Sequence, residues 1–311
     1  MKKILVYVSF FLVVAGIRAG WSANDSEEIQ VMAEQDIRLA LEAYIEEVEQ
    51  APIEPRLDPV FQFVPGLYGL AVDFELSYQN MLSYGQFDPS LIVAKGIPYE
   101  GNPDNFRQHR IYKGNENSPY VGLLINVAWG SEELDEILDL LDEYNVLASI
   151  FFEGKFADNH HDQVRDVLDR GHLIGNHSYS HPADWLQHSY EEFQREIVLT
   201  NDILRSITNE EVIYFAPPGG AFTEETIRAA YDQGMYTILW SADSIDWRGE
   251  PAHVLVERVM DRIGPGGLIL THPKPETVRA LPEIIERVRG EGLEFRRIDE
   301  IVSGRRGEVA E

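Results

Sequence analysis

The sequence predicts an α/β protein whose main part is a slightly incomplete barrel of seven strands with helices outside it. From Val121 onward, short apolar runs alternate with amphipathic helical stretches, a pattern typical of a parallel sheet covered by helices. Seven such repeats suit a barrel better than an open sheet. Polar residues also follow several of the apolar runs, as expected where strand ends share one rim.

The expected strands are short and rich in apolar residues. They cover Gly122–Ala128, Ala148–Phe152, His172–Gly175, Val212–Phe215, Tyr236–Ser241, Gly267–Thr271 and Glu294–Arg297. The segments between them carry apolar residues at helical spacing, for example Glu132–Tyr144, Glu191–Ile207, Glu224–Asp232, Ala252–Ile263 and Pro275–Arg289.

Candidate functional residues follow the ends of three of these strands. His177 and His181 follow the third strand, Asp243 and Asp246 follow the fifth, and His272 follows the sixth. Active sites of such barrels lie at the carboxyl ends of the strands. Two imidazoles four residues apart on a turn are able to bind one divalent cation. The sequence therefore predicts one site on one rim.

The composition limits the partners and the metal chemistry. Acidic residues outnumber basic ones 53 to 26 among 311 residues, for a formal charge of -27. Such a field disfavours nucleic acid and anionic polymers and favours cations and neutral or cationic partners, although solubility alone also accounts for it. With no cysteine in the chain, a metal site must use histidine and oxygen ligands, and disulfides are excluded.

The N-terminal third divides into two predicted parts. Residues 1–23 have a basic start and an apolar run from Ile4 to Ile17, which predicts a signal peptide or an uncleaved signal anchor and an extracytoplasmic protein. Residues 24–119 are expected to form an acidic helix, from Asp25 to about Gln50, followed by a small accessory module. The barrel is expected at residues 120–305. The oligomeric state is open.

Four motifs then carry a family resemblance. They are His177-Ser-Tyr-Ser-His181, Phe215-Ala-Pro-Pro-Gly-Gly220, Trp240-Ser-Ala-Asp-Ser-Ile-Asp-Trp247 and Leu268-Ile-Leu-Thr-His272. In this order and spacing, the chain from Val121 to Gly304 resembles the NodB-type polysaccharide deacetylase domain of carbohydrate esterases. The resemblance implies a distorted (β/α)7 barrel that acts on N-acetylated glycan by metal-assisted hydrolysis of a carbon-nitrogen amide bond.

The resemblance also implies roles for individual residues. The family holds a divalent metal, usually zinc, with one aspartate and a histidine pair, and uses a second aspartate as base, with an arginine that orients it. A histidine protonates the leaving amine, and an aspartate supports that histidine. Matched positions are His177 and His181 for the metal, His272 for the general acid, Asp246 for its partner, and Trp240 and Leu270 for the apolar walls of the sugar and acetyl pocket.

Three positions depart from the family pattern. Ala128 stands in place of the base, Trp129 in place of the metal aspartate, and Ala216 in place of the arginine. In the family the base and its arginine form a buried ion pair, and removing only one member of such a pair costs about 3–5 kcal/mol of stability. We therefore interpret Ala128 and Ala216 as the joint loss of both members. Two protein ligands alone bind zinc more weakly than three, and Asp243 or Glu132 is the candidate substitute ligand.

Trp129 allows two interpretations: it plugs the metal cavity, which we favour, or it offers a flat face to a sugar ring. The stretch Leu124-Ile-Asn-Val-Ala-Trp-Gly130 is also similar to a sporulation-associated branch of the family, which implies a cell-wall or spore-cortex context. Three functions follow: a deacetylase-family protein with impaired or lost catalysis, a non-catalytic glycan- or protein-binding scaffold, or a residual hydrolase with a substitute metal ligand.

Overall fold

The computed structural model describes residues 23–306, so the predicted signal segment at residues 1–23 lies outside the described residues except for its last position. The described chain divides into two compact units. Residues 23–50 and 70–95 form the helical unit, and residues 51–69 and 96–306 form the barrel unit. Among the described residues, no helix has both the length and the apolar character needed to cross a membrane.

The helical unit is built from two helices that share a small core. The predicted N-terminal helix is α1 (Ala23–Val48), and it packs on α2 (Phe74–Tyr84). Asp73 caps α2 by accepting from the Leu76 amide at 3.0 Å. Buried side chains of the core are Ile37, Leu41, Tyr78 and Met81. A two-stranded sheet of β3 (Gly69–Val72) and β4 (Ala94–Ile97) and a short turn of helix, η1 (Pro89–Leu91), complete this segment.

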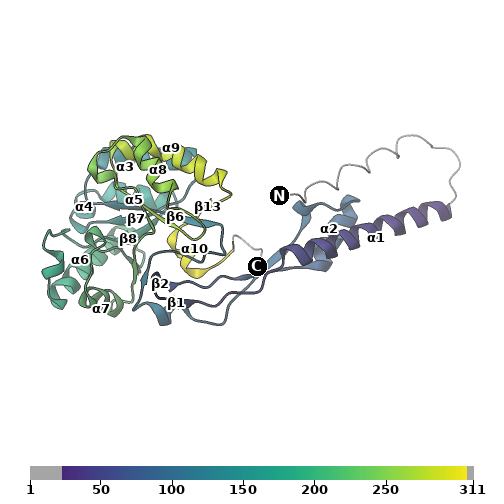
Figure 1. The fold of residues 1–311 in the computed structure, drawn as a ribbon, viewed down its shortest axis with the longest axis horizontal. Coiled ribbons are helices and arrows are strands. Elements are labelled where there is room, and N and C mark those ends of the chain that lie inside the picture. The colour runs from purple at the N-terminus through teal and green to yellow at the C-terminus, as the bar shows by residue number, and fades with distance from the viewer. Residues whose placement is uncertain (1–22, 307–311) are drawn as a thin grey trace. The chain divides into compact units, whose positions relative to one another are not determined.

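Seven parallel strands form the centre of the barrel unit (Figure 1). In sheet order they are β10 (Tyr236–Ile238), β9 (Tyr214–Phe215), β8 (Leu173–Asn176), β7 (Ser149–Phe152), β6 (Tyr120–Val127), β12 (Leu268–Thr271) and β11 (Ala242–Asp243). A further short strand, β13 (Glu294–Phe295), pairs with the start of β6.

The connection from β10 to β11 shows that this sheet is curled. These two strands lie at opposite ends of the parallel order, yet only residues 239–241 separate them in the chain. Leu239 donates its amide to Ile111 on one side, at 2.7 Å, and Ser241 donates to Leu268 on the other, at 3.1 Å. The prediction of a distorted barrel is confirmed. The prediction of one strand at Tyr236–Ser241 is wrong, because the chain crosses there between the two edges.

Three strands from the N-terminal third extend the same sheet. They are β1 (Arg56–Asp58) and β2 (Gln62–Val64), an antiparallel pair, and β5 (Arg110–Ile111), which lies between β2 and β10. A turn of helix, η2 (Pro103–Phe106), precedes β5. Parts of the segment expected as a separate module are thus hydrogen-bonded to the barrel. The predicted division into one domain at residues 24–119 and another at 120–305 stays a prediction.

Two apolar layers enclose the strands. Leu123, Ile125 and Val127 of β6 face the helices, whereas Leu124 faces the barrel interior, as strand alternation requires. The outer helices are α3 (Ser131–Glu143), α4 (Gly154–Asn159), α5 (His161–Asp169), α6 (Tyr190–Thr208), α7 (Glu224–Asp232), α8 (Ala252–Met260) and α9 (Pro275–Gly290). One further helix, α10 (Ile298–Ser303), packs its apolar side chains into the interior cluster.

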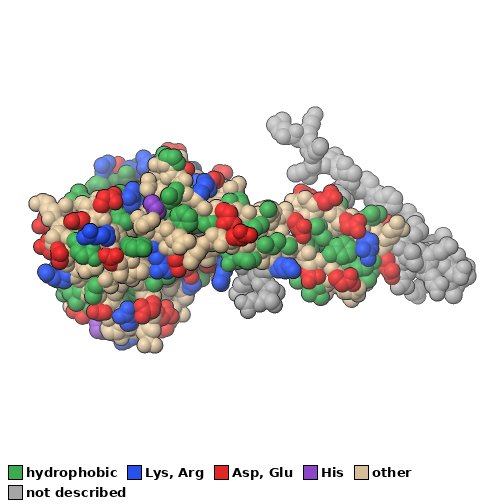
Figure 2. All heavy atoms as spheres, turned by 90° about the horizontal axis from the view of Figure 1, so that it is seen from below, with side chains coloured by type: hydrophobic (Ala, Val, Ile, Leu, Met, Phe, Trp, Pro, Cys, Tyr) green, Lys and Arg blue, Asp and Glu red, His purple; other side chains and the backbone are tan. Residues whose placement is uncertain are grey.

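Charged groups cover the outside of the barrel unit. Figure 2 shows Lys and Arg side chains set among Asp and Glu on the face that it presents. Many of these groups are paired; Arg170, for example, contacts Asp139, Asp142 and Asp166 at 2.6–2.9 Å. Exposed pairs of this kind contribute little to stability, so the two apolar layers hold the fold and fix the strand ends that carry the site.

Candidate functional site

The first predicted histidine extends from the end of β8 into the rim of strand ends, here called the barrel rim. His177 is 2% exposed, and its Nδ1 lies 2.7 Å from the carbonyl oxygen of Ala216. A carbonyl oxygen only accepts, so Nδ1 carries the proton and Nε2 keeps a free lone pair. The amide of His177 continues the sheet by donating to Phe152 at 2.9 Å.

The segment 177–181, here called the histidine loop, is held in an unfavourable backbone conformation. Ser178 and His181 have φ of 64° and 43°, a region that costs non-glycine residues about 1–2 kcal/mol each. Glu196 of α6 holds the loop by accepting from the amides of Tyr179, at 3.0 Å, and Ser180, at 2.8 Å. It also accepts from the Ser180 hydroxyl at 2.9 Å.

The two imidazoles of the loop lie close together. The ring centroids of His177 and His181 are 5.1 Å apart, with 56° between the ring planes. Burial, together with the smaller effect of the neighbouring His181, lowers the pKa of His177 to about 3. The pKa of His181 is also lowered, mainly by burial. Both rings are therefore neutral at pH 7, and each keeps one nitrogen lone pair.

Trp129 fills the space between His181 and His272. Its ring is stacked on His272, with centroids 5.8 Å apart and 12° between the planes, and meets His181 edge-on at 6.3 Å. The ammonium of Lys274 lies 5.0 Å from the Trp129 ring centroid. Gly130 follows with φ of 77°, and a Cβ there would lie 2.5 Å from the carbonyl oxygen of Pro273. Glycine is thus required where the two loops touch.

Asp246 holds His272 through a saturated hydrogen-bond network. The carboxylate is fully buried and accepts from His272 Nδ1 at 2.7 Å, from the His272 amide at 2.6 Å and from the Thr277 hydroxyl at 2.7 Å. Burial alone would raise the pKa of Asp246, but these hydrogen bonds outweigh it and hold the pKa below its ordinary value. The ionised Asp246 fixes the proton of His272 on Nδ1.

Two of the departing positions, Ala128 and Ala216, lie at the same level of the rim as His177. Val127 is aligned with Phe152, Phe152 with Asn176, and Asn176 with Phe215. Ala128, His177 and Ala216 each follow one of these aligned residues, so the sheet places the three at neighbouring strand ends. Ala216 is 2% exposed and Ala128 is half-buried.

The predicted pocket walls lie deeper in the barrel. Trp240 is half-buried and packs on the interior cluster, and a Cβ on Gly220 would come within 2.6 Å of its ring. Leu270 belongs to that cluster and is 2% exposed. Their roles in binding a sugar or acetyl group stay predictions.

The donor set at the rim does not fit a three-ligand metal centre. Among residues 23–306, no three His, Cys, Asp or Glu side chains form a group that could hold a metal ion. Neither candidate substitute, Asp243 or Glu132, completes such a group with the histidine pair, and Asp243 accepts instead from the Ile245 amide at 2.8 Å. A catalytic zinc site takes three protein ligands, whereas the loop offers two imidazole nitrogens.

Several supporting residues were not identified from the sequence. Glu196 and Asn176 hold the histidine loop, Thr277 completes the Asp246 network, and Lys274 lies over Trp129. Of these residues, only Lys274 could have been noticed in the sequence, because it is a charged residue two positions after His272. Glu196 lies in a helix whose other glutamates are exposed, and nothing in its spacing separates it from them.

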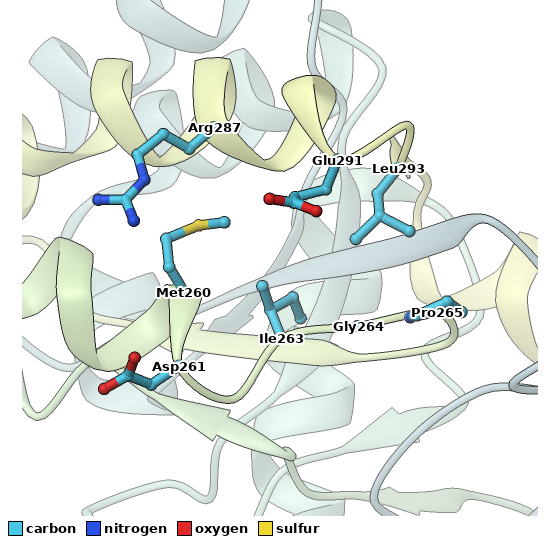
Figure 3. Close-up of a pocket in the computed structure, with 8 residues that line it drawn as sticks. All are labelled: Met260, Asp261, Ile263, Gly264, Pro265, Arg287, Glu291 and Leu293. Atoms are coloured by element: carbon cyan, nitrogen blue, oxygen red, sulfur yellow. The ribbon is translucent and has the colours of Figure 1, made fainter. Parts of the chain in front are cut away.

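A half-open cavity lies away from the rim. Figure 3 shows it between the ends of α8 and α9, where Met260, Ile263 and Leu293 line it, and its volume is about 370 Å³. Arg287, which also lines it, is paired with Glu257 of α8 at 2.5 Å. The cavity holds no histidine and lies near the amino end of β12, so the rim remains the candidate site.

Comparisons with known proteins agree with the motifs. The family model described as polysaccharide deacetylase matches residues 113–238. The uncharacterized protein YlxY of Bacillus subtilis is 33% identical over 82% of this chain and 80% of its own length. A peptidoglycan-N-acetylglucosamine deacetylase of Bacillus cereus is 28% identical over 75% of this chain and 92% of its own.

A solved structure has the same fold. It is wild-type BA3943 of Bacillus anthracis, described as a CE4 family pseudoenzyme, with a TM-score of 0.82 and 34% identity over 87% of this chain and 96% of its own. A mutant of BA3943 is described as having restored enzymatic activity. The motifs, the curled sheet and these likenesses together show that the chain belongs to the polysaccharide deacetylase family, the NodB-type carbohydrate esterases of family 4.

Proposed function

We propose that this chain binds N-acetylated cell-wall glycan at the barrel rim without hydrolysing it. The proposal is carried by the side chains at three positions: Ala128, Ala216 and Trp129 stand where the family pattern places the base, its arginine and the metal aspartate. The Bacillus anthracis pseudoenzyme, similar over most of both chains, supports it. So does the similarity to a Bacillus cereus protein whose name gives peptidoglycan as its substrate.

The remaining groups suit recognition better than amide hydrolysis. Hydrolysis needs a base to activate water and an acid to protonate the leaving amine. His272 and Asp246 supply the second function only. Ala128 provides no base, and two imidazoles provide an incomplete metal site. Neutral His181, which is half-buried, keeps a nitrogen lone pair that accepts from hydroxyl or amide N–H groups of a sugar.

The proposal includes the place where the protein acts. Family relatives named as peptidoglycan deacetylases support an extracytoplasmic location. In the proposal, residues 1–23 serve as a signal peptide or as an uncleaved membrane anchor, and the cell wall or spore cortex is the setting. Fractionation of cells and N-terminal sequencing of the protein test both: detection of the protein in the cytosol alone would contradict this location.

Metal content and acetate release test the loss of catalysis. The purified protein, after incubation with zinc and gel filtration, is expected to hold less than about 0.1 zinc per chain and to release no acetate from N-acetylglucosamine oligomers or peptidoglycan fragments. The same protein is expected to be retained on insoluble peptidoglycan. Stoichiometric zinc together with acetate release would overturn the proposal and favour a residual hydrolase with a substitute ligand.

Restoring the lost groups tests the same proposal from the other side. The variant with Ala128→Asp, Trp129→Asp and Ala216→Arg regains a carboxylate ligand, a base and its guanidinium. We expect zinc binding to appear first, because the histidine loop is already in place. A matched variant, Ala221→Arg with Asp184→Asn, changes nearby loop charges and is expected to bind no zinc. Failure of the first variant to bind zinc would mean that the loop no longer provides ligand geometry.

A further inference from the structure

The half-open cavity between the ends of α8 and α9, here called the α8–α9 cavity, has the size of a small-molecule site. Its volume is about 370 Å³, and ligand pockets typically measure about 300–1,000 Å³. Figure 3 shows apolar side chains along it: Met260 from the end of α8, Ile263 from the turn that follows, and Leu293 from the turn after α9. A Cβ added to Gly264, which also lines the cavity, would meet open space. The cavity is therefore accessible at this turn.

Both helices end at this cavity with an acidic residue. Asp261 is the first residue after α8 and Glu291 the first after α9, and both line the cavity. In Figure 3 the carboxylate of Glu291 points inward, toward Met260 and Ile263. The C-terminus of a helix carries the equivalent of about half a negative charge, so a carboxylate there is unfavourable unless a cation lies nearby.

The nearby cations of the protein do not neutralise these two carboxylates. Among residues 23–306, neither Asp261 nor Glu291 forms an ion pair or a side-chain hydrogen bond. Arg287 lines the cavity, but its Nη1 lies 2.5 Å from Glu257 of α8. Arg262, directly after Asp261, lines a separate hollow on α8.

The other basic residues in the last turns of the two helices are also held elsewhere. Arg258 of α8 pairs with Glu250. Arg289 of α9 donates to the backbone carbonyl oxygens of Tyr144 and Asn145. The cavity thus combines two unpaired carboxylates with two helix ends of negative polarity, which together attract an external cation.

The lining suits an organic cation rather than a metal ion. Within the described part of the chain, no three His, Cys, Asp or Glu side chains form a group that could hold a metal. The side chains of Met260, Ile263 and Leu293 favour burial of methylene groups, whereas a hard metal ion needs oxygen ligands. A ligand that matches both parts of the lining has an ammonium at the end of an alkyl chain.

We propose that the α8–α9 cavity binds a primary alkylammonium group, with its ammonium on the carboxylate of Glu291 and its methylene chain on the apolar side chains that line the cavity. A lysine side chain of a peptide and a free aliphatic diamine both carry this group. The cavity lies near the amino end of β12, away from the barrel rim. Binding there does not depend on the glycan-binding function proposed above.

Methyl NMR of the purified protein tests this site by titration with pentylamine, pentanol and pentanoate, which share one chain length. Pentylamine should shift the methyl resonances of Met260, Ile263 and Leu293 with a Kd on the order of 1 mM. Pentanol, which has no charge, should bind about fivefold more weakly, and pentanoate more weakly still. Propylamine should bind about tenfold more weakly than pentylamine, because each buried methylene changes the binding constant up to about fourfold.

Glu291→Gln removes the inward carboxylate and keeps the size of the side chain. It should weaken pentylamine binding about three- to fivefold and leave pentanol binding unchanged. Glu286→Gln is the matched control, because it removes the same charge from an exposed position of the same helix that does not line the cavity. This variant should bind every compound as the unaltered protein does.

Equal affinity for pentylamine and pentanol would overturn the inference. Unchanged pentylamine affinity in Glu291→Gln, or shifts confined to methyl groups outside the cavity, would also overturn it. Titration with an N-acetylated lysine amide and with cadaverine then separates the two sources of the ammonium. Tighter binding of the lysine derivative supports a peptide side chain as the ligand, and tighter binding of cadaverine supports a free diamine.

Discussion

The two sides of the barrel rim differ in how their polar groups are supported. Around β8, β11 and β12, His177, Asp246 and His272 each have hydrogen-bond partners at 2.6–2.9 Å. At the ends of β6 and β9, Ala128 and Ala216 have no polar side-chain atom. The first side has the polar groups predicted from the family resemblance, and the second has alanine where that resemblance predicts a base and its arginine.

The difference teaches that retention of a residue here does not require catalysis. Asp246 satisfies His272 and Thr277, so replacing it would leave buried donors without an acceptor whatever the protein does. A base carboxylate and its arginine, in contrast, satisfy mainly each other, and they can be lost together without leaving an unpaired charge. Stability alone therefore gives a sufficient reason for the Asp246 network, whether or not the protein catalyses a reaction.

The largest expected effect comes from returning only one member of the lost pair. Ala216→Arg places a guanidinium at a position that is 2% exposed and should lower the free energy of unfolding by about 4 kcal/mol. Adding Ala128→Asp should recover about 2 kcal/mol or more, since the pair is then complete. Urea denaturation of the single and double variants measures this coupling.

Ala221→Arg is the control for the arginine, because it lies in the same loop segment but is half-buried. Its cost should be below about 1 kcal/mol. If Ala216→Arg is equally destabilising with and without Ala128→Asp, the two alanines did not arise from loss of one pair, and the contrast between the two sides weakens.

On the retained side, Asp246→Asn should cost about 3 kcal/mol, because the amide cannot accept all three hydrogen bonds that the carboxylate accepts. The pKa of Asp246 is lowered in the folded state, so its contribution is present above its unfolded pKa and is lost as the pH falls through the folded pKa. The difference between the variant and the unaltered protein should therefore shrink below pH 4. Asp243→Asn, which removes one acceptor, serves as control, and an equal cost for both would contradict the argument.

Much of the contrast between the two sides of the barrel rim was predictable from the sequence, because it depends on which residues stand at the strand ends. Apolar runs located the strands and therefore the rim on which His177 and His272 meet. The crossing at residues 239–241 was missed, since Tyr236–Ser241 reads as one continuous apolar strand. The short strand β5 was missed because a strand of two residues is too short to show alternation. Its pairing with β10 is also a long-range contact that local sequence does not reveal.

A buried histidine outside the rim provides a reference for acid sensitivity. His172 is 1% exposed, just before β8, and accepts from the Ala148 amide at 3.1 Å. Burial lowers its pKa to about 4, below the ordinary value near 6.5. As the pH falls through that window the unfolded chain binds a proton that the folded chain does not, so about 2 kcal/mol of stability is lost between pH 6.5 and 5.

His172→Gln keeps an acceptor for the Ala148 amide and removes this titration. The variant should show a shallower loss of stability from pH 6.5 to 5 in urea denaturation, with a cost near 1 kcal/mol at pH 7. His161→Gln changes a histidine whose side chain is 46% exposed and serves as the control. An unchanged slope in His172→Gln would show that the acid sensitivity resides in other groups, with the rim histidines as the next to test.

The smallest expected effect concerns the contact that holds the histidine loop. Glu196→Ala removes the acceptor of three hydrogen bonds, but water reaches this half-buried site, so we expect a cost of about 1 kcal/mol. Hydrogen exchange at the amides of Tyr179 and Ser180 should accelerate about tenfold, because strained backbone at Ser178 and His181 then relaxes. Glu191→Ala, an exposed residue of the same helix, should alter neither quantity. Unchanged exchange at the two amides would mean that the loop holds its own conformation and that the retained side of the rim is more rigid than its contacts imply.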